Sequence, residues 1–209
     1  MNDHDTDLPG YDTLATGGRA EHKVRRSLFV AEAHPLADPD EVRARVADVA
    51  RRHRDCRHVC HGWRVGHGAD QGEGRSDGGE PAGTAGEPIL AALRGAEVTD
   101  ALVVVARWFG GVKLGTGGLG RAYRDAAAAA LAAAPRRRVL LGRTFALDFG
   151  YELVGSLEHL LARCRGRVEA SDFAERVTWT VWLPEDRWSS FARDLETLTH
   201  GRVKMRAPG

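Results

Sequence analysis

The residues best suited to chemistry lie in the stretch 107–123, which carries six glycines, two adjacent aromatic residues and several cations. An apolar run over 101–106 precedes it and predicts a buried strand, and an alanine-rich run over 122–134 predicts a helix. Glycine permits positive φ and close approach to the backbone, and a helix N-terminus offers free N–H groups and partial positive charge. With Lys113 and Arg121 beside it, this first loop predicts a cradle for an anion, and we expect phosphate.

The predicted anion- and nucleic-acid-binding set takes its members from this loop: Arg107, Trp108, Gly110, Gly111, Lys113, Gly115, Gly117, Gly118 and Arg121. The cations would contact phosphates, and the two aromatic residues, Trp108 and Phe109, would stack on bases. No Gly-x-Gly-x-x-Gly is followed by a ribose-binding acid about twenty residues on, and no Walker Gly-Lys-Ser/Thr ends the loop. A nucleotide cofactor is therefore not indicated, and a tight turn packed against its own domain is the open alternative.

A second loop, over residues 74–88, is rich in turn-forming residues, and its candidate binding residues are Ser76, Asp77, Glu80, Gly83 and Thr84. The carboxylates of Asp77 and Glu80 could form an acid/base pair or bind a metal ion. Such residues more often cap a helix or fix a turn. We therefore assign no catalytic residue and no metal ligand here.

In order and spacing the two loops resemble the IMPACT/YigZ family. Its pattern is close to S-D-D-G-E-P-x-G-T-A-G-x-P-I-L, followed by V-V-V-x-R-Y-F-G-G-x-K-L-G-x-G-G-L-x-R-A-Y. The chain matches the first part from Ser76 to Leu90 and the second from Val103 to Tyr123. The segment His58-Val59-Cys60 is similar to the H-x-C segment of the family. The resemblance is strong over about residues 27 to 135.

Three positions depart from the family pattern. One of the two adjacent aspartates is glycine, so that Asp77 stands alone before two glycines. The arginine before the phenylalanine of the first strand is Leu28, and the tyrosine of the first loop is Trp108. The missing carboxylate weakens a metal or acid/base role at the second loop, and the missing arginine slightly weakens anion binding.

Length, charge and apolar runs narrow the class of protein. The chain has 209 residues, enough for one large or two small domains, and a net charge of only +1. Nothing resembles a signal peptide or a membrane span, so we predict a soluble, cytoplasmic protein with no membrane partner. Residues 19–139 hold 20 basic and 15 acidic side chains, which makes the region of both loops the basic one.

The cysteines do not indicate a disulfide framework, because there are only three. Two of them cluster with histidines over residues 53–61. The cluster spans a helix end and a strand and lacks the spacing of a closed zinc site, so no metal is assigned to it.

Periodicity predicts two folded domains after an acidic tail over residues 1–20, which we expect to be disordered. Residues 21–138 are predicted to form an α+β domain, with strands at 27–33, 58–65 and 101–106, helices at 40–53, after 84 and at 122–134, and a polar loop at 66–74. After a boundary at 135–138, residues 139–209 follow the order βαββαβ, which is ferredoxin-like. Its strands are predicted at 144–149, 167–173, 176–183 and 202–206, and its helices at 153–164 and 184–198. The family resemblance implies the same second domain and a first domain similar to ribosomal protein S5 domain 2.

We favour a non-enzymatic RNA- or ribosome-associated protein that modulates translation, without a cofactor. The resemblance adds a protein of the translation machinery as a second type of partner. The alternative is a small-molecule phosphate- or nucleotide-binding enzyme that uses the first loop, with Asp77 or Glu80 holding magnesium. The S5-like fold is shared with sugar and mevalonate-type kinases, which is an analogy at the level of the fold. A protein-interaction module is the third possibility, with a docking surface on the C-terminal sheet formed by Trp179, Trp182 and Trp188.

Overall fold

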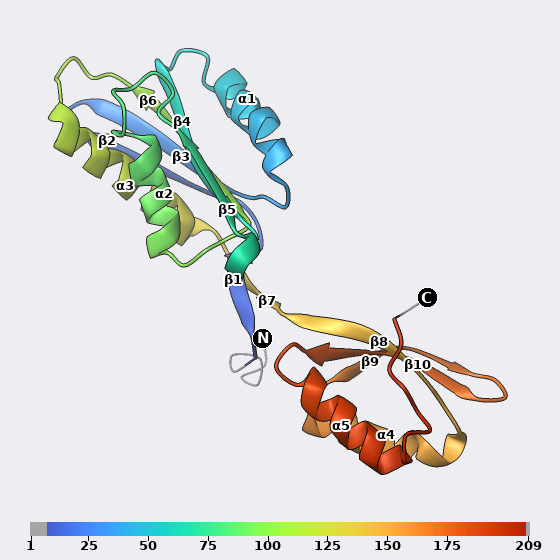
Figure 1. The fold of residues 1–209 in the computed structure, drawn as a ribbon. Helices are drawn as coiled ribbons and strands as arrows, with labels where there is room; N and C mark the ends of the chain where they lie inside the picture. Colours follow the sequence, from blue (N-terminus) through green and yellow to red (C-terminus); the bar gives the residue numbers. More distant parts are fainter. Residues whose placement is uncertain (1–7, 208–209) are drawn as a thin grey trace. The chain divides into compact units, whose positions relative to one another are not determined.

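A computed structural model describes residues 8–207 of the chain (Figure 1). The chain divides into two compact units. Tyr11–Val139 forms the N-terminal unit, and the residues from Leu140 onward, with the described residues before Tyr11, form the C-terminal unit. Among residues 8–207, no helix is both long and apolar enough to cross a bilayer.

The N-terminal unit is built on a five-stranded antiparallel sheet of order β2-β3-β6-β4-β5. Helices α2 and α3 cover one face and α1 the other (Figure 1). The central strand β6 is buried from Ala101 to Arg107, because both of its faces are covered. The elements are β2 Gly18–Val24, β3 Ser27–Pro35, α1 Val42–Arg52, β4 His58–Val65, β5 Gly72–Ser76, α2 Gly86–Gly95, β6 Ala101–Trp108 and α3 Gly115–Ala133, with short 3₁₀ turns at Pro39–Glu41 and Gly68–Asp70.

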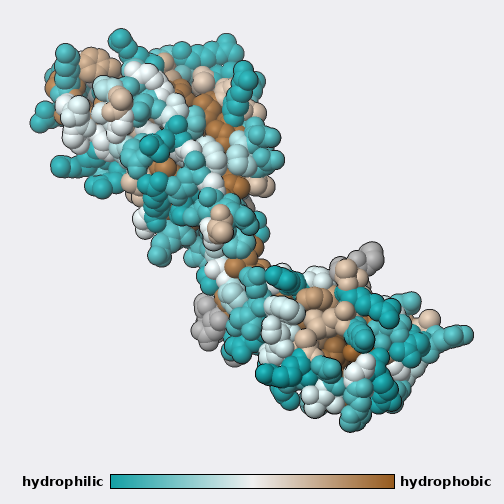
Figure 2. All heavy atoms as spheres, in the orientation of Figure 1, coloured by the Kyte–Doolittle hydropathy of each residue, from teal (hydrophilic) through white to brown (hydrophobic). Residues whose placement is uncertain are grey.

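Alternation along β6 decides which side chains meet each helix layer. Val103 and Val105 pack with α2 and α3, whereas Leu102 and Val104 pack with α1. The same alternation takes the strand's last residues, Arg107 and Trp108, to opposite faces of the sheet. Helix α1 covers only part of its side of the sheet. Figure 2 shows a band of apolar side chains between α1 and the layer of α2 and α3.

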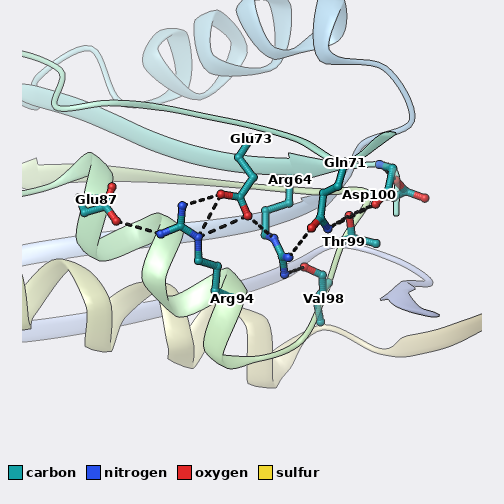
Figure 3. A network of polar contacts seen from close by, with 9 residues as sticks. Arg64, Gln71, Glu73, Glu87, Arg94, Val98, Thr99 and Asp100 are labelled. Atoms are coloured by element: carbon teal, nitrogen blue, oxygen red, sulfur yellow. Dashed lines mark hydrogen bonds and ion pairs between the residues drawn. The ribbon is translucent and has the colours of Figure 1, made fainter. Parts of the chain in front are cut away.

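Strand β5 lies partly where the sequence predicted a polar loop over 66–74, so that prediction is wrong for residues 72–74. Glu73 accepts hydrogen bonds from Arg64 of β4 at 2.8 Å and from Arg94 of α2, and Arg94 also pairs with Glu87 at 3.0 Å (Figure 3). These polar contacts, with the backbone pairing to β4, hold a strand that lacks the apolar alternation of a half-buried one.

The prediction of a disordered tail is wrong for part of residues 1–20. Strand β1 spans Gly10–Leu14, β2 already begins at Gly18, and the predicted residues 1–7 lie outside the described part of the chain. The hydroxyl of Tyr11 donates to Asp100 Oδ2 at 2.6 Å, and Leu14 is buried in the core with α3. The predicted boundary at 135–138 also differs, because β7 Arg136–Leu140 forms a two-stranded sheet with β1.

The C-terminal unit is a three-stranded antiparallel sheet of order β8-β10-β9, with α4 and α5 packed on one face. The predicted strand over 202–206 is reduced to a single bridge between Arg206 and Ala146. Pro184 ends β10 and does not start the helix as predicted, since α5 begins at Trp188. The elements are β8 Gly142–Phe149, a 3₁₀ turn at Tyr151–Leu153, α4 Val154–Arg163, β9 Arg167–Phe173, β10 Val177–Pro184 and α5 Trp188–Thr199.

The tryptophans offered as a docking surface are mostly covered. Trp179 and Trp182 are both buried, although their spacing along β10 places them on opposite faces of the sheet. Trp182 is covered because the guanidinium of Arg167 lies 4.0 Å from its ring centroid. Trp188 is the exposed member of the three. The fold is α+β, while the S5-like and ferredoxin-like assignments of its parts stay predictions.

Candidate anion-binding site

Helix α3 begins earlier than the sequence predicted, and this changes the first loop. It starts at Gly115, so most of the predicted loop glycines lie in its first two turns, and only Gly110 and Gly111 remain in the connection from β6. The prediction of a six-glycine loop is therefore wrong. The buried side chains of Leu119 and Tyr123 pack against the core from the same side of the helix. This packing outweighs the poor helix propensity of glycine.

A pocket of about 540 Å³ opens at the N-terminal end of α3, and we call it the α3 pocket. Residues from three separate parts of the N-terminal unit line it. They are Arg57 and His58 at the start of β4, Gly79, Glu80 and Pro81 of the second loop, and Arg107, Phe109, Lys113, Leu114, Gly115, Thr116 and Leu119 of the first loop and α3. The structure thus brings both glycine-containing loops to one site.

A buried ion pair forms one wall of the α3 pocket. Arg107 Nη1 lies 2.6 Å from Glu80 Oε1, and the two side chains are 7% and 4% exposed. The hydroxyl of Tyr123 donates to the same oxygen at 2.8 Å. The guanidinium of Arg107 lies near the rings of Phe29 and Phe109, at 5.4 and 5.6 Å from their centroids. Glu80 therefore fixes the second loop against β6 and neutralises Arg107.

Cys60 lies beneath this wall and is not a candidate nucleophile. Its Sγ lies 3.3 Å from the Tyr123 hydroxyl and 2.9 Å from the Asp77 carbonyl oxygen. Burial raises the pKa of the Cys60 thiol to about 12, so the thiolate is scarce at neutral pH.

Asp77 acts as the hub of the second loop. Its Oδ1 accepts from the backbone N–H groups of Ala85 and Gly86 at 2.9 and 2.8 Å, and its Oδ2 accepts from Gly83 at 2.9 Å. Burial works to raise the pKa of Asp77, but these backbone donors outweigh it and hold the pKa below its usual value. Asp77 thus caps the start of α2, which is the structural alternative that the sequence left open.

The other predicted residues of the second loop also bond within it. Ser76 Oγ accepts from the Gly78 N–H at 3.3 Å, and the buried Thr84 hydroxyl donates to the Pro81 carbonyl at 2.7 Å. Gly83 has φ +75°, which favours glycine. The second loop is therefore a self-contained scaffold that presents Glu80 to the α3 pocket.

The first turn of α3 is open in contrast. The backbone N–H groups of Gly115, Thr116 and Gly117 donate to no acceptor within residues 8–207. Lys113 and Arg57 line the same pocket, and neither has a carboxylate at ion-pair distance in the described structure. Free N–H groups and unpaired cations beside a helix N-terminus form a site that attracts anions.

Of the nine residues predicted for the first loop, Arg107, Lys113 and Gly115 line the α3 pocket. The other six do not: Trp108, Gly110, Gly111, Gly117, Gly118 and Arg121. Trp108 lies on the α1 face, with its ring 5.3 Å from that of His53, and Arg121 lines a separate groove between α2 and α3. Gly110 serves packing, because an added Cβ there would meet the backbone of Arg26 at 2.0 Å. Of the two aromatic residues, Phe109 is the one at the pocket, with 46% of its surface exposed.

Sequence reasoning missed Arg57, which lines the α3 pocket, and the two arginines of the β2–β3 turn. Arg57 reaches the pocket because its N–H bonds to the Arg107 carbonyl at 3.1 Å, a pairing that no local pattern reveals. Arg25 and Arg26 form the β2–β3 turn beside Gly110, with φ values of +45° and +69°. Two arginines where a hairpin turn favours asparagine and glycine are a signal that the sequence did contain.

Family profiles, curated relatives and a solved structure each match a large part of the chain. The profile of the Impact N-terminal domain matches residues 25–131, and that of a domain of unknown function (DUF1949) matches residues 147–202. The chain is 34% identical to IMPACT family member YigZ of Escherichia coli (strain K12), over 88% of this chain and 91% of the relative. It is 28% identical to IMPACT family member YvyE of Bacillus subtilis (strain 168), over 95% and 91%. A solved structure described as a crystal structure of an hypothetical protein has a TM-score of 0.64 and 32% identity, over 97% of this chain and 98% of that one.

Proposed function

This chain belongs to the IMPACT family, and from its α3 pocket we propose that it is a non-enzymatic protein that binds phosphate groups of RNA and modulates translation. The proposal that phosphate binds rests on the first turn of α3, where the N–H groups of residues 115–117 have no acceptor in the described structure. Lys113 and Arg57 line the same pocket. The part that concerns translation rests on the family resemblance.

The charge of the pocket fits a phosphate ligand. Glu80 neutralises Arg107, and Arg57 and Lys113 then leave a net positive charge in the lining. The helix dipole adds partial positive charge at Gly115. A phosphate oxygen accepts hydrogen bonds from such N–H groups without displacing any bond within the protein.

Phe109 favours RNA as the carrier of the phosphate. Its exposed ring adjoins the pocket, and a base that stacks on such a ring contributes about 1–3 kcal/mol. Unpaired bases are available for stacking in single strands and loops of RNA. The pocket thus offers a phosphate site and a base site next to each other.

The enzyme alternative has less support. It needs Asp77 or Glu80 to hold magnesium, but Asp77 accepts three backbone N–H groups and Glu80 is buried against Arg107 and Tyr123. Neither carboxylate is therefore presented to a bound nucleotide as a free oxygen ligand.

The test measures binding of a labelled single-stranded RNA and of ribosomal subunits across a salt series. We expect affinity to fall with salt, and the slope of log affinity against log salt to drop by about 0.7 for each phosphate contact removed. Lys113→Ala removes one cation, and Thr116→Pro removes one N–H donor at a position where a helix tolerates proline. Arg43→Ala, on the exposed side of α1, is the matched control.

Two results would contradict the proposal. The first is unchanged binding in the Lys113→Ala/Thr116→Pro double variant, and the second is no binding of RNA or subunits even at low salt. A thermal-shift panel of nucleotides and sugar phosphates with magnesium tests the enzyme alternative. A large shift with one compound alone would favour that alternative.

A further inference from the structure

The first two turns of α3 contain glycines that the fold does not require. A Cβ added at Gly117 would meet no atom within 4 Å, and one at Gly118 or Gly120 would meet only ordinary contacts at 3.5 and 3.4 Å. None of these three has a positive φ, unlike Gly115 with φ +73°. Glycine is a poor helix former. Packing within the protein therefore does not explain Gly117.

A second basic surface lies beside Gly117, between α2 and α3. The groove between α2 and α3, about 320 Å³ in volume, is lined by Gly117, Gly120, Arg121 and Arg124 of α3, and we call it the α2–α3 groove. Arg121 and Arg124 have no ion-pair partner within residues 8–207. The one acidic residue of its lining, Glu87, is already engaged by Arg75 and Arg94. The groove is therefore positively charged.

The two sites meet at the first turn of α3. Thr116 lines the α3 pocket and Gly117, the next residue, lines the α2–α3 groove. A ligand that leaves the α3 pocket across this turn passes over Gly117, where the missing side chain allows close approach to the backbone.

Arg107 also has hydrogen-bond donors that no acceptor in the described structure uses. It is more than nine-tenths buried and lines the pocket, and its Nε has no hydrogen-bond partner in the described structure. Glu80 engages only Nη1, so the guanidinium retains unused donor capacity beside the pocket.

We propose that a single strand of RNA crosses the first two turns of α3 over Gly117. One phosphate lies in the α3 pocket, at the free N–H groups and Lys113, and following phosphates lie in the α2–α3 groove at Arg121 and Arg124. The exposed ring of Phe109 favours a single strand over a duplex, because paired bases are not free to stack on it. This inference rests on the proposed function and specifies the form of its ligand.

The test compares oligouridylates of about two and about eight nucleotides by fluorescence anisotropy, since single-strand sites commonly span about 4–16 nucleotides. In the Arg121→Ala/Arg124→Ala variant we expect affinity for the longer strand to fall about tenfold and its salt slope to drop by about 1.4. Affinity for the shorter strand stays that of the unmodified protein, because it reaches only the α3 pocket.

Gly117→Ala separates a binding role from a structural one. The added methyl group should weaken binding of the longer strand while the thermal unfolding temperature rises, because alanine favours the helix. Gly155→Ala is the matched control: Gly155 is an exposed glycine in the first turn of α4, with no atom within 4 Å of an added Cβ. It should raise stability without changing RNA affinity.

The outcomes distinguish the inference from the proposed function. If neither strand binds the unmodified protein, both fail. If both strands bind but the Arg121→Ala/Arg124→Ala and Gly117→Ala variants bind the longer one as tightly as before, the path across α3 is overturned and the α3 pocket stands. Displacement of the longer strand by polyglutamate at equal concentration would assign the surface to an acidic peptide and overturn RNA as its occupant.

Discussion

The two glycine-rich segments of the N-terminal unit look alike in sequence and differ in structure. In the second loop the polar side chains bond to neighbours, with Asp77 alone accepting three backbone N–H groups. At the start of α3 the N–H groups of residues 115–117 and the cation of Lys113 have no partner in the described structure. The density of glycine and charge therefore does not separate a scaffold from a binding surface, whereas the satisfaction of polar groups does.

The largest change in unfolding free energy is expected in the second loop, at Glu80. Glu80→Ala leaves the buried guanidinium of Arg107 without its ion-pair partner, and we expect the free energy of unfolding to fall by about 3–5 kcal/mol. Urea denaturation followed by far-UV circular dichroism measures it. Glu87→Ala, which breaks exposed pairs with Arg75 and Arg94, should cost no more than about 1 kcal/mol. Equal losses in the two variants would show that Glu80 is not buried as described.

Asp77→Ala should cause the second-largest loss of unfolding free energy. The substitution leaves three backbone donors without their shared acceptor, and we expect a loss of about 2–3 kcal/mol in unfolding free energy. The same urea titration measures it. A loss below about 0.5 kcal/mol would mean that water replaces the carboxylate at little cost, and that the second loop does not depend on Asp77.

The pH dependence of the Asp77 contribution has a definite sign. The pKa of Asp77 is held below its usual 3.8 in the folded protein, so the unfolded chain binds the proton more readily. Its stabilising contribution is present above pH 3.8 and is lost as the pH falls through the folded pKa. The stability difference between the unmodified protein and Asp77→Asn should therefore shrink in that acidic range, as measured by urea titrations at a series of pH values. A difference that grows on acidification would contradict this assignment.

Alanine substitutions at Gly115 and at Gly117 should change the unfolding free energy in opposite directions. Gly115→Ala forces a Cβ into a backbone with φ +73° and should cost about 1 kcal/mol in unfolding free energy. Gly117→Ala adds a Cβ to open space within a helix and should gain up to about 1 kcal/mol. Differential scanning calorimetry of both variants measures the contrast. Destabilisation by both would mean that Gly117 has a packing role after all.

The smallest change in unfolding free energy is expected at Lys113, in the α3 pocket. Lys113→Ala removes an exposed cation with no partner among residues 8–207, so its unfolding free energy should change by less than about 0.5 kcal/mol. Its RNA affinity should nonetheless fall. A large loss of stability would place Lys113 in the scaffold with Glu80 and Asp77, and the contrast between the two segments would disappear.

Much of the fold followed from local pattern. The strands at 58–65 and 167–173 have the predicted bounds, and β6 extends the predicted strand at 101–106 by two residues. These segments carry apolar alternation, continuous apolar runs or clear turn signals, which are properties of neighbouring residues. The resemblance to the IMPACT family also followed from the order and spacing of the two loops, and the comparisons bear it out.

Local pattern failed where distant contacts decide the structure. Residues 115–121 are helical because Leu119 and the residues after it pack on the core, although glycine signals a loop. Strand β1 forms because Tyr11 bonds to Asp100 and Leu14 reaches the core. Strand β5 is held by the contacts of Glu73 with Arg64 and Arg94.

By itself, the sequence determined the α+β class, most of its strands and helices, and the two segments that could do chemistry, because these depend on residues close together in the chain. Only the tertiary structure decided which segment is scaffold and which is open. The pairing of β4 with β6 brings Arg57 to Lys113, and the ion pair of Arg107 with Glu80 joins residues that are far apart in the chain. Whether a polar group is satisfied or free depends on such partners, and no spacing along the chain contains that information.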